Sequence, residues 1–178
     1  MNTILITKPK IPEDIIQIQE VFYRTWLETY PNKKVGITRE DIEEYFKNRL
    51  DPEMIQKRIN AFSQLPSNEL FLVAKDGEKV IGVCRIVNRE TYNQLQAIYV
   101  LSEYQRHGVG KMFWDKGREF FDKSKDTIVQ VAIYNKKAIS FYEKLGFVDT
   151  GKRFTEERHK MPISGALIPE MEMVLVKK

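Results

Sequence analysis

The residues from Gln105 to Lys111 are the part of this sequence whose types and spacing most clearly permit chemistry. They lie between an apolar run and an amphipathic run, which predicts a glycine-bearing turn from a strand into a helix. Gly108 and Gly110 would let the backbone approach a ligand closely. The first amides of the helix lack internal partners and carry partial positive charge, and Arg106 and Lys111 add full charges. This combination predicts a site for a phosphate or a diphosphate.

Two common phosphate-binding motifs do not fit this segment. A Walker A loop needs a hydroxyl residue after its lysine, and here Met112 follows Lys111. A dinucleotide fingerprint needs a third small residue at position 113, which is Phe113. The pattern that does fit is Gln-x-x-Gly-x-Gly, from Gln105 to Gly110. A glycine-rich turn that binds no ligand is the competing interpretation of this pattern taken alone.

A second motif follows at residues 135–147, after another apolar run. Asn135 suits the N-cap of a helix and can still present its amide to a ligand. Spacing of the type i, i+3, i+4, i+7 places on one helix face Ala138, Phe141, Tyr142 and Leu145. Core packing is the ordinary role of such a face, and we favour that role for Phe141.

Together the two motifs resemble the acetyl-CoA signatures of the GNAT N-acetyltransferase superfamily, Gln-x-x-Gly-x-Gly and Asn-x-x-Ala-x-x-Phe-Tyr-x-x-x-Gly-Phe, in the family's order and separation. The resemblance covers nearly the whole chain, residues 3–176, and is strongest over residues 95–147. It implies an α/β (α+β) fold in which helices flank a mixed, mostly antiparallel sheet. Two strands of that sheet would splay apart at the acetyl-CoA site. Acetyl-CoA would be the cosubstrate, and no metal is implied.

The resemblance also implies roles for individual residues. The strand before the loop would pair with the pantetheine arm, and the backbone N–H near Ile98 would face the thioester carbonyl oxygen. Tyr142 would protonate the leaving thiolate, so the implied catalytic groups are Tyr142 and Ile98. The cofactor-binding residues implied in this way are Ile98, Tyr99, Val100, Gln105, Arg106, His107, Gly108, Val109, Gly110, Lys111, Asn135, Ala138 and Tyr142.

The sequence leaves open which group deprotonates the acceptor amine. Some relatives place a glutamate on the strand before the loop, but this strand offers only the amides of Asn93, Gln94 and Gln96. The carboxylates that remain as alternatives are Glu28, Glu90 and Glu103. His107 is a poor candidate because its motif position faces the phosphate loop. His159 lies in the polar stretch 155–169 and is expected at the surface.

A primary amine is the expected acceptor, and Trp26 and Tyr30 are the candidate residues for binding it. They lie one turn apart on an expected helix, where an aromatic pair could hold an amine by cation–π contact. Burial of Trp26 in the core is an equally weighted alternative. The pattern is closest to the PaiA-type spermidine/spermine N-acetyltransferases. The alternatives are a RimI-like enzyme acting on protein N-termini, a non-catalytic CoA-binding regulatory module, and a plain nucleotide-binding protein.

Length and composition indicate a globular chain of one domain, residues 1–178, with 42% hydrophobic and 30% charged residues. No apolar run approaches the ~20 residues of a membrane span, and no signal-peptide core is present. The net charge of +4 comes from scattered residues, so no nucleic-acid partner is expected. A single cysteine, Cys84, fits a cytoplasmic location. A homodimer is compatible with the sequence.

The elements that must position the two motifs follow from hydrophobic periodicity and turn residues. Strands are expected at residues 3–7, 70–75, 79–88, 95–101, 127–133, 147–154 and 170–176. Helices are expected at residues 12–30, 39–50, 53–65, 109–123 and 136–145. Asp76-Gly77 marks a hairpin, and Thr38 with Asp41 resembles a capping box. The long loop at residues 155–169 is expected to be functional or mobile.

Overall fold

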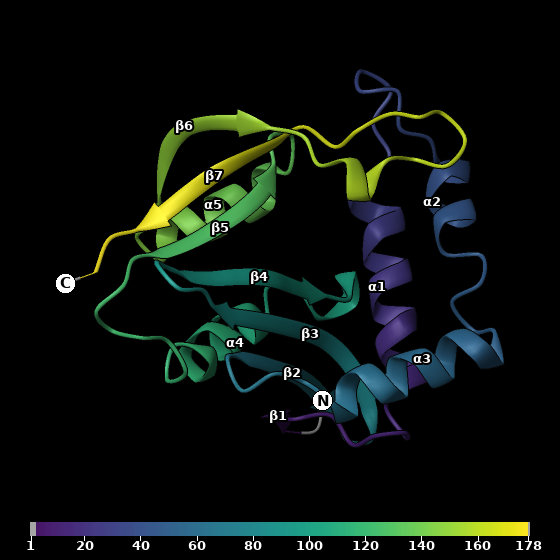
Figure 1. The fold of residues 1–178 in the computed structure, drawn as a ribbon, viewed down its shortest axis with the longest axis horizontal. Helices are drawn as coiled ribbons and strands as arrows, with labels where there is room; N and C mark the ends of the chain where they lie inside the picture. Colours follow the sequence, from purple (N-terminus) through teal and green to yellow (C-terminus); the bar gives the residue numbers. More distant parts are fainter. Residues whose placement is uncertain (1–2, 178) are drawn as a thin grey trace.

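In the computed structural model, which describes residues 3–177, seven strands form one sheet in the order β1-β2-β3-β4-β5-β7-β6 (Figure 1). The strands are β1 (Ile4–Thr7), β2 (Glu69–Asp76), β3 (Lys79–Asn88), β4 (Asn93–Val100), β5 (Thr127–Ala132), β6 (Val148–Phe154) and β7 (Glu170–Leu175). The helices are α1 (Ile15–Thr29), α2 (Arg39–Tyr45), α3 (Pro52–Ser63), α4 (Val109–Gly117) and α5 (Lys136–Lys144). Only β4 and β5 run parallel, so the sheet is mixed and mostly antiparallel, as predicted.

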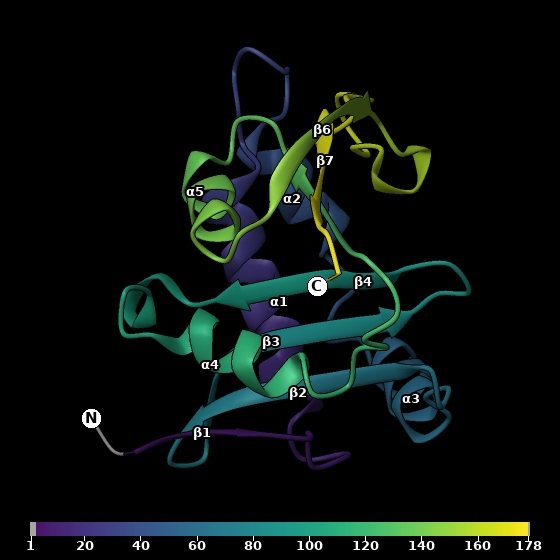
Figure 2. The same ribbon diagram turned by 90° about the vertical axis from the view of Figure 1, so that its left-hand side faces the viewer.

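The helices divide between the two faces of the sheet. α4 and α5 lie together on one face (Figure 2), where Phe113 and Trp114 of α4 join the largest cluster of the core. α1 packs on the other face, where its apolar residues contact β2 and β3. Side chains alternate along β4, so Ile98 and Val100 face α4 and α5, whereas Tyr99 faces α1.

β4 and β5 pair at one end only, and this junction shapes the middle of the sheet. Their parallel register consists of Asn93 with Thr127, Gln94 with Ile128, and Leu95 with Val129. Beyond these pairs the two strands diverge (Figure 1), and the remainder of β4 is paired with β3 alone. A β-bulge accompanies the divergence, because the β3–β4 register passes from Leu95 to Ala97 and leaves Gln96 unmatched. The expected pair of splayed strands is therefore confirmed.

Local sequence signals account for several element boundaries. The Asp76-Gly77 hairpin joins β2 to β3, and Gly77 has the positive φ of 61° that such a tight turn requires. The capping box at α2 is also confirmed. Thr38 Oγ1 accepts a hydrogen bond from Asp41 N (3.1 Å), and Asp41 Oδ2 accepts one from Thr38 N (2.9 Å).

Two helices end at least five residues earlier than predicted. α2 ends at Tyr45 rather than at residue 50, and α4 ends at Gly117 rather than at residue 123. After Gly117 the backbone forms turns, such as the one closed by Phe120 N and Gly117 O (2.9 Å), and side chains of the sheet also bind it. Asn88 Nδ2 donates to Phe120 O (2.9 Å), and Asn93 Nδ2 donates to Asp122 O (2.9 Å). Helical periodicity alone could not reveal this competition, because the competing donors lie about 30 residues away in sequence.

A buried ion pair joins the start of α1 to β2. Lys75 Nζ lies 2.7 Å from Asp14 Oδ1, and only 6% and 3% of the two side chains are exposed. The second carboxylate oxygen of Asp14 accepts a hydrogen bond from Lys10 N (2.7 Å), so both oxygens have partners. Elsewhere in the fold, none of the helices within residues 3–177 combines the length and apolar content that a bilayer crossing requires.

Candidate active site

The turn into α4 has the backbone conformation of an anion-binding loop. Gly108 is the N-cap of α4 with φ of 81°, and Arg106 also has a positive φ, 65°, which is uncommon for a residue with a side chain. The first bond of the i→i−4 type runs from Met112 N to Gly108 O (2.9 Å). The N–H groups of residues 109–111 precede that bond, so they remain available to a ligand at the positive end of the helix dipole. Left-handed residues beside such amides form a concave nest suited to phosphate oxygens.

The side chains of this loop anchor it more than they add charge. Gln105 Nε2 donates to Val100 O (3.0 Å), which ties the loop to the last residue of β4. Lys111 Nζ is paired with Asp115 Oδ2 (2.5 Å) on the same helix. Gly110 packs on α5, because a Cβ at this position would lie 3.2 Å from the ring of Phe141. The backbone amides are therefore the main anion donors, and the Lys111 charge is shared with a carboxylate.

The free edge of β4 offers hydrogen-bonding groups to the gap between β4 and β5. Leu101 N donates to Ile81 O (3.0 Å), so this residue and, by alternation, Tyr99 direct their backbone groups toward β3. The N–H and C=O of Ile98 and of Val100 must then point away from β3, toward the gap. The expectation that an N–H near Ile98 faces the gap agrees with this register.

The second motif begins α5 as predicted. Asn135 Oδ1 accepts a hydrogen bond from Ala138 N (3.1 Å), which makes Asn135 the N-cap of the helix. Tyr142 is buried, with 6% of its surface exposed, and its ring packs against Phe141 and Phe147 at 5.3 and 5.7 Å between centroids. Burial raises the pKa of Tyr142, and the nearby Tyr99 and Cys84 raise it further. The hydroxyl is therefore fully protonated near neutral pH and can serve only as a proton donor there.

A cluster of tyrosines lies on the α1 face of the gap. Tyr30 Oη and Tyr99 Oη are 3.0 Å apart, and Tyr134 Oη donates to Tyr30 O (3.0 Å). Burial is the largest cause of a raised pKa at all three residues, and the pKa of Tyr134 reaches about 12. We refer to Tyr30, Tyr99 and Tyr134 as the tyrosine cluster. It brings together the C-cap residue of α1, a residue of β4 and a residue that follows β5, and its hydroxyls are all neutral near pH 7.

Trp26, one of the two expected acceptor residues, is buried beside this cluster. Its ring lies 4.6 Å from that of Tyr30 and is stacked on that of Tyr45 at 5.2 Å between centroids, and 7% of the residue is exposed. The indole Nε1 is buried without a hydrogen-bond partner among the described residues, although it is near enough to Tyr99 to lower the pKa of that hydroxyl slightly against the effect of burial. Trp26 therefore forms part of the core, and Tyr30 carries the polar group of the pair.

The expectation that His159 is a surface residue is wrong. The loop 155–169 folds back so that the imidazole packs edge-on against Trp26, at 5.6 Å between ring centroids, and burial lowers the pKa of His159. Met161 and Ile168 of the same loop are almost fully buried, which holds the loop against α1 and α2. The loop is mostly polar in sequence, so the burial of Met161 and Ile168 could not be predicted from its composition.

The three carboxylates considered as bases occupy other positions. Glu103 binds Arg24 (3.1 Å), and although burial raises its pKa, hydrogen bonds from its own backbone and from Arg24 lower it overall. Glu28 is exposed and accepts a hydrogen bond from Ser102 Oγ (3.1 Å). Glu90 lies in the turn between β3 and β4, at the end where β4 and β5 are still paired.

The carboxylate that the structure does place beside the tyrosine cluster is Glu170, at the start of β7. Burial raises the pKa of Glu170 to about 7; Glu156 raises it further and Arg158 opposes the rise. Polar atoms of Glu156, His159 and Glu170 lie within 4.8 Å of one another, a spacing that could hold a divalent cation. Arg158 already pairs with Glu156, which makes a cation there less favourable. The only signal for this position in the sequence is that Glu170 precedes the apolar Met171 in a strand, so the two side chains must face opposite sides of the sheet.

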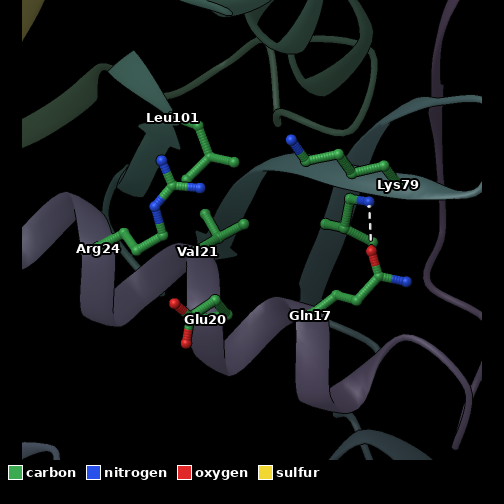
Figure 3. Close-up of a pocket in the computed structure, with 7 residues that line it drawn as sticks. Gln17, Glu20, Val21, Arg24, Lys79 and Leu101 are labelled. Atoms are coloured by element: carbon green, nitrogen blue, oxygen red, sulfur yellow. Dashed lines mark hydrogen bonds between the residues drawn. The ribbon is translucent and has the colours of Figure 1, made fainter. Parts of the chain in front are cut away.

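Two hollows on the surface of the described residues lie elsewhere. A hollow of about 100 Å³ between α1 and β3 is lined by Arg24, Gln17 and Lys79, among others (Figure 3). Gln17 Oε1 accepts a hydrogen bond from Val80 N (2.8 Å) there, and Arg24 is paired with Glu103, so these groups are already satisfied. A groove of about 690 Å³ follows the edge of β2 near α3. Neither contains a residue of the loop 105–111 or of the tyrosine cluster, so neither is the candidate site.

A sheet that opens beside a nest of amides at a helix N-terminus is the arrangement that the resemblance to the GNAT acetyltransferases implies. The chain belongs to the GNAT acetyltransferase family, because the family model described as "Acetyltransferase (GNAT) domain" matches residues 27–161. That match includes both motifs and most of the residues around the gap.

Curated relatives and solved structures agree with this membership. The chain is 36% identical over 78 residues to a probable N-acetyltransferase of Mycobacterium tuberculosis, covering 44% of this chain and 42% of the relative. It is 35% identical over 99 residues to the probable N-acetyltransferase san of Drosophila melanogaster, covering 51% and 54%. The chain thus spans about half the length of these relatives. The fold is similar to that of the PaiA N-acetyltransferase from Thermoplasma acidophilum in complex with coenzyme A, with a TM-score of 0.70, 24% identity, and coverage of 98% and 99%.

Proposed function

We propose that this protein transfers the acetyl group of acetyl-CoA to a primary amine, and that the acceptor is a small molecule such as a polyamine. The observation that carries the proposal is the free edge of β4, whose Ile98 N–H is directed into a gap that Gln105 ties to the N-terminus of α4. Acetyl-CoA supplies an activated acetyl group as a thioester. The residues of this chain would bind it, polarise it and move protons around it.

Each part of the site has a distinct task in this proposal. The amides of residues 109–111 would bind the diphosphate. The Ile98 N–H would donate to the thioester carbonyl oxygen, where negative charge develops. The Tyr142 hydroxyl, kept protonated by burial, would donate a proton to the departing sulfur. The amine would reach the gap from the α1 face, where the tyrosine cluster offers neutral hydroxyls and aromatic rings.

Two observations support a small cationic acceptor. The structure with a TM-score of 0.70 is a PaiA N-acetyltransferase, and this chain presents carboxylates and aromatic rings together on the α1 face. The test is thiol release from acetyl-CoA with spermidine, spermine, aminoglycosides, free amino acids and N-terminal peptides, with the acetylated product identified by mass. Turnover on peptides alone would favour the alternative of a protein N-terminal acetyltransferase. Binding of acetyl-CoA without turnover on any amine would favour a non-catalytic CoA-binding module.

The Gly108→Val variant is expected to weaken acetyl-CoA binding tenfold or more, or about 1.4 kcal/mol. Gly108 has φ of 81°, which a β-branched residue adopts only with strain, so the backbone should relax and turn the amides of the nest away. Gly110 is a poorer choice for this test because its substitution would also press on Phe141. Calorimetry with acetyl-CoA gives the affinity.

Gly151→Val is the matched control for this prediction. Gly151 has φ of 82°, and a Cβ added there would meet no atom within 4 Å, as at Gly108, but Gly151 lies in the exposed strand β6. The control should lose similar stability and keep its acetyl-CoA affinity. Equal affinity losses in the two variants would show that the turn at Gly108 does not bind the diphosphate.

Tyr30→Phe is expected to raise the KM for the acceptor about 2- to 10-fold, the range for one lost hydrogen bond. The change removes the hydroxyl that lies 3.0 Å from Tyr99 Oη and keeps the ring against Trp26. Acetyl-CoA affinity should stay the same, because the hydroxyl lies on the α1 face. Tyr23→Phe, on the same helix but packed against Phe46, should leave both values unchanged. A lower melting temperature with an unchanged KM would assign Tyr30 to the core instead.

A further inference from the structure

Glu170 is the first residue of β7 and lies beside the last residues of β5 and β6. It is in register with Ala132, the last residue of β5, and with Phe154, the last residue of β6. Met171 and Met173 of β7 point into the cluster on the α5 side, so the alternating side chain of Glu170 points to the opposite face, toward α1. The position is half-buried, which leaves the carboxylate accessible from one side.

The groups that face Glu170 come from every element packed around it. Tyr30 of α1, Tyr99 of β4 and Tyr134 after β5 all interact with its charge. From the loop 155–169, Glu156, Arg158 and His159 surround it as well. Tyr99 also raises the pKa of Tyr142, which lies on the opposite face of β4.

We propose that Glu170 is the base that takes a proton from the acceptor ammonium, an inference that rests on the proposed acetyltransferase function. One N–H bond of the ammonium breaks and its proton passes to a carboxylate oxygen of Glu170, directly or through the Tyr99 and Tyr30 hydroxyls. The nitrogen lone pair then forms the bond to the acetyl carbon as the carbon–sulfur bond breaks, and the acetylated nitrogen releases its remaining excess proton to solvent. Tyr142 protonates the sulfur and regains a proton from solvent, and Glu170 returns its own proton to solvent.

The environment of Glu170 suits this task better than that of an ordinary carboxylate. An alkyl ammonium has a pKa near that of lysine, about 10.4, so transfer of its proton to a carboxylate of ordinary pKa, about 4.3, is unfavourable by about 10⁶-fold. At the raised pKa of about 7, the same transfer is unfavourable by only about 10³-fold. A base works best with a pKa near the operating pH, and Glu170 meets that condition.

The pH dependence has a definite sign. Glu170 accepts a proton only as the carboxylate, so kcat/KM should fall as the pH falls below about 7 and level off above it. Replacement of the carboxylate by an amide should remove this fall in kcat/KM at acidic pH, which we call the acidic limb. At high pH more of the amine is already neutral, so the deficit of such a variant should shrink there.

The experiment compares wild type, Glu170→Gln and Glu172→Gln with spermidine between pH 5.5 and 9.5. Glu172 lies two residues along on the same face of β7 and is paired with Lys152 (3.0 Å), so it is a matched control. Glu170→Gln is expected to lower kcat/KM about 10²-fold at pH 7, to lose the acidic limb, and to keep its acetyl-CoA affinity and melting temperature. Glu172→Gln should behave as wild type. A wild-type pH profile in Glu170→Gln would overturn the proposal, as would loss of the limb in His159→Gln with Glu170 intact. Loss of wild-type activity on chelation with EDTA would also overturn it, by assigning the cluster to a metal.

Failure of the proposed function would look different. In that case wild type itself would release no thiol with any amine of the screen. Titration of ¹³C-labelled glutamate carboxyls by NMR then tests Glu170 directly, with Glu170→Gln assigning its signal. An apparent pKa near 7 that moves on addition of spermidine supports a carboxylate that meets the amine. An ordinary pKa with no response to spermidine overturns the inference whatever the reaction.

Discussion

Replacement of Tyr142 by phenylalanine is expected to lower kcat about 10²-fold while the acetyl-CoA Kd and the melting temperature stay near wild-type values. The ring and its packing against Phe141 and Phe147 are kept, and only the buried hydroxyl is lost. A missing general acid typically costs about 10²–10⁴-fold, and the low end applies because water can protonate a thiolate slowly. The loss should appear in kcat and in kcat/KM equally, since the interaction is made in the transition state.

Tyr104→Phe is the control for this variant. The Tyr104 hydroxyl donates to Asp76 Oδ2 (3.3 Å) on β2, which β3 and β4 separate from the gap, so its removal should leave kcat unchanged. The measurement must use single-turnover conditions, in which chemistry rather than product release sets the rate. A wild-type rate for Tyr142→Phe under those conditions would show that another group protonates the sulfur.

Replacement of Asp14 by alanine is expected to destabilise the protein by about 3–5 kcal/mol, because it leaves the Lys75 ammonium buried without a partner. The pair holds the start of α1 against β2, and the lost carboxylate also leaves Lys10 N without its acceptor. Urea unfolding gives the free energy, and a fall in the midpoint without a change in slope would show a loss of stability with no change in the surface exposed on unfolding.

The double variant Asp14→Asn/Lys75→Met separates charge from packing at this site. It removes both charges and keeps similar volumes, so it should recover most of the stability that Asp14→Ala loses. Additive losses from the two positions would mean that the ion pair contributes little and that the side chains act independently. Catalysis should be unchanged in the double variant, since the pair lies outside the gap.

Those parts of the fold and site that depend on short-range chemistry could be predicted from the sequence. Gly108 at the start of α4, Asn135 at the start of α5 and the Asp76-Gly77 hairpin all act within a few residues of their own position. The two motifs also carried the resemblance to the GNAT family, and that resemblance implied the fold and the two strands on either side of the gap.

What the sequence could not provide depends on contacts between distant segments. β7 inserts between β5 and β6, which brings Glu170 next to Ala132 and to the tyrosine cluster. His159 looked like part of a solvated loop, but burial of Met161 and Ile168 draws it against Trp26. α4 stops at Gly117 because Asn88 and other polar groups of the sheet compete for its backbone. No periodicity in the sequence encodes these three outcomes.

The short junction between β4 and β5 can act as a hinge between the two parts of the sheet. Three residue pairs are the only strand pairing that joins β1–β4 to β5–β7 in the described chain, with Gln94 Nε2 and Gln130 Oε1 adding a side-chain link at 3.4 Å. The open end of β4 lies about five residues away, roughly 17 Å at about 3.3 Å per residue. At that distance, which follows from the strand rise, a rotation of about 5° at the junction would move the mouth of the gap by about 1.5 Å. The width of the mouth is thus controlled at Gln94 and its neighbours, and substitutions there would change how readily a ligand enters without altering any group that contacts it.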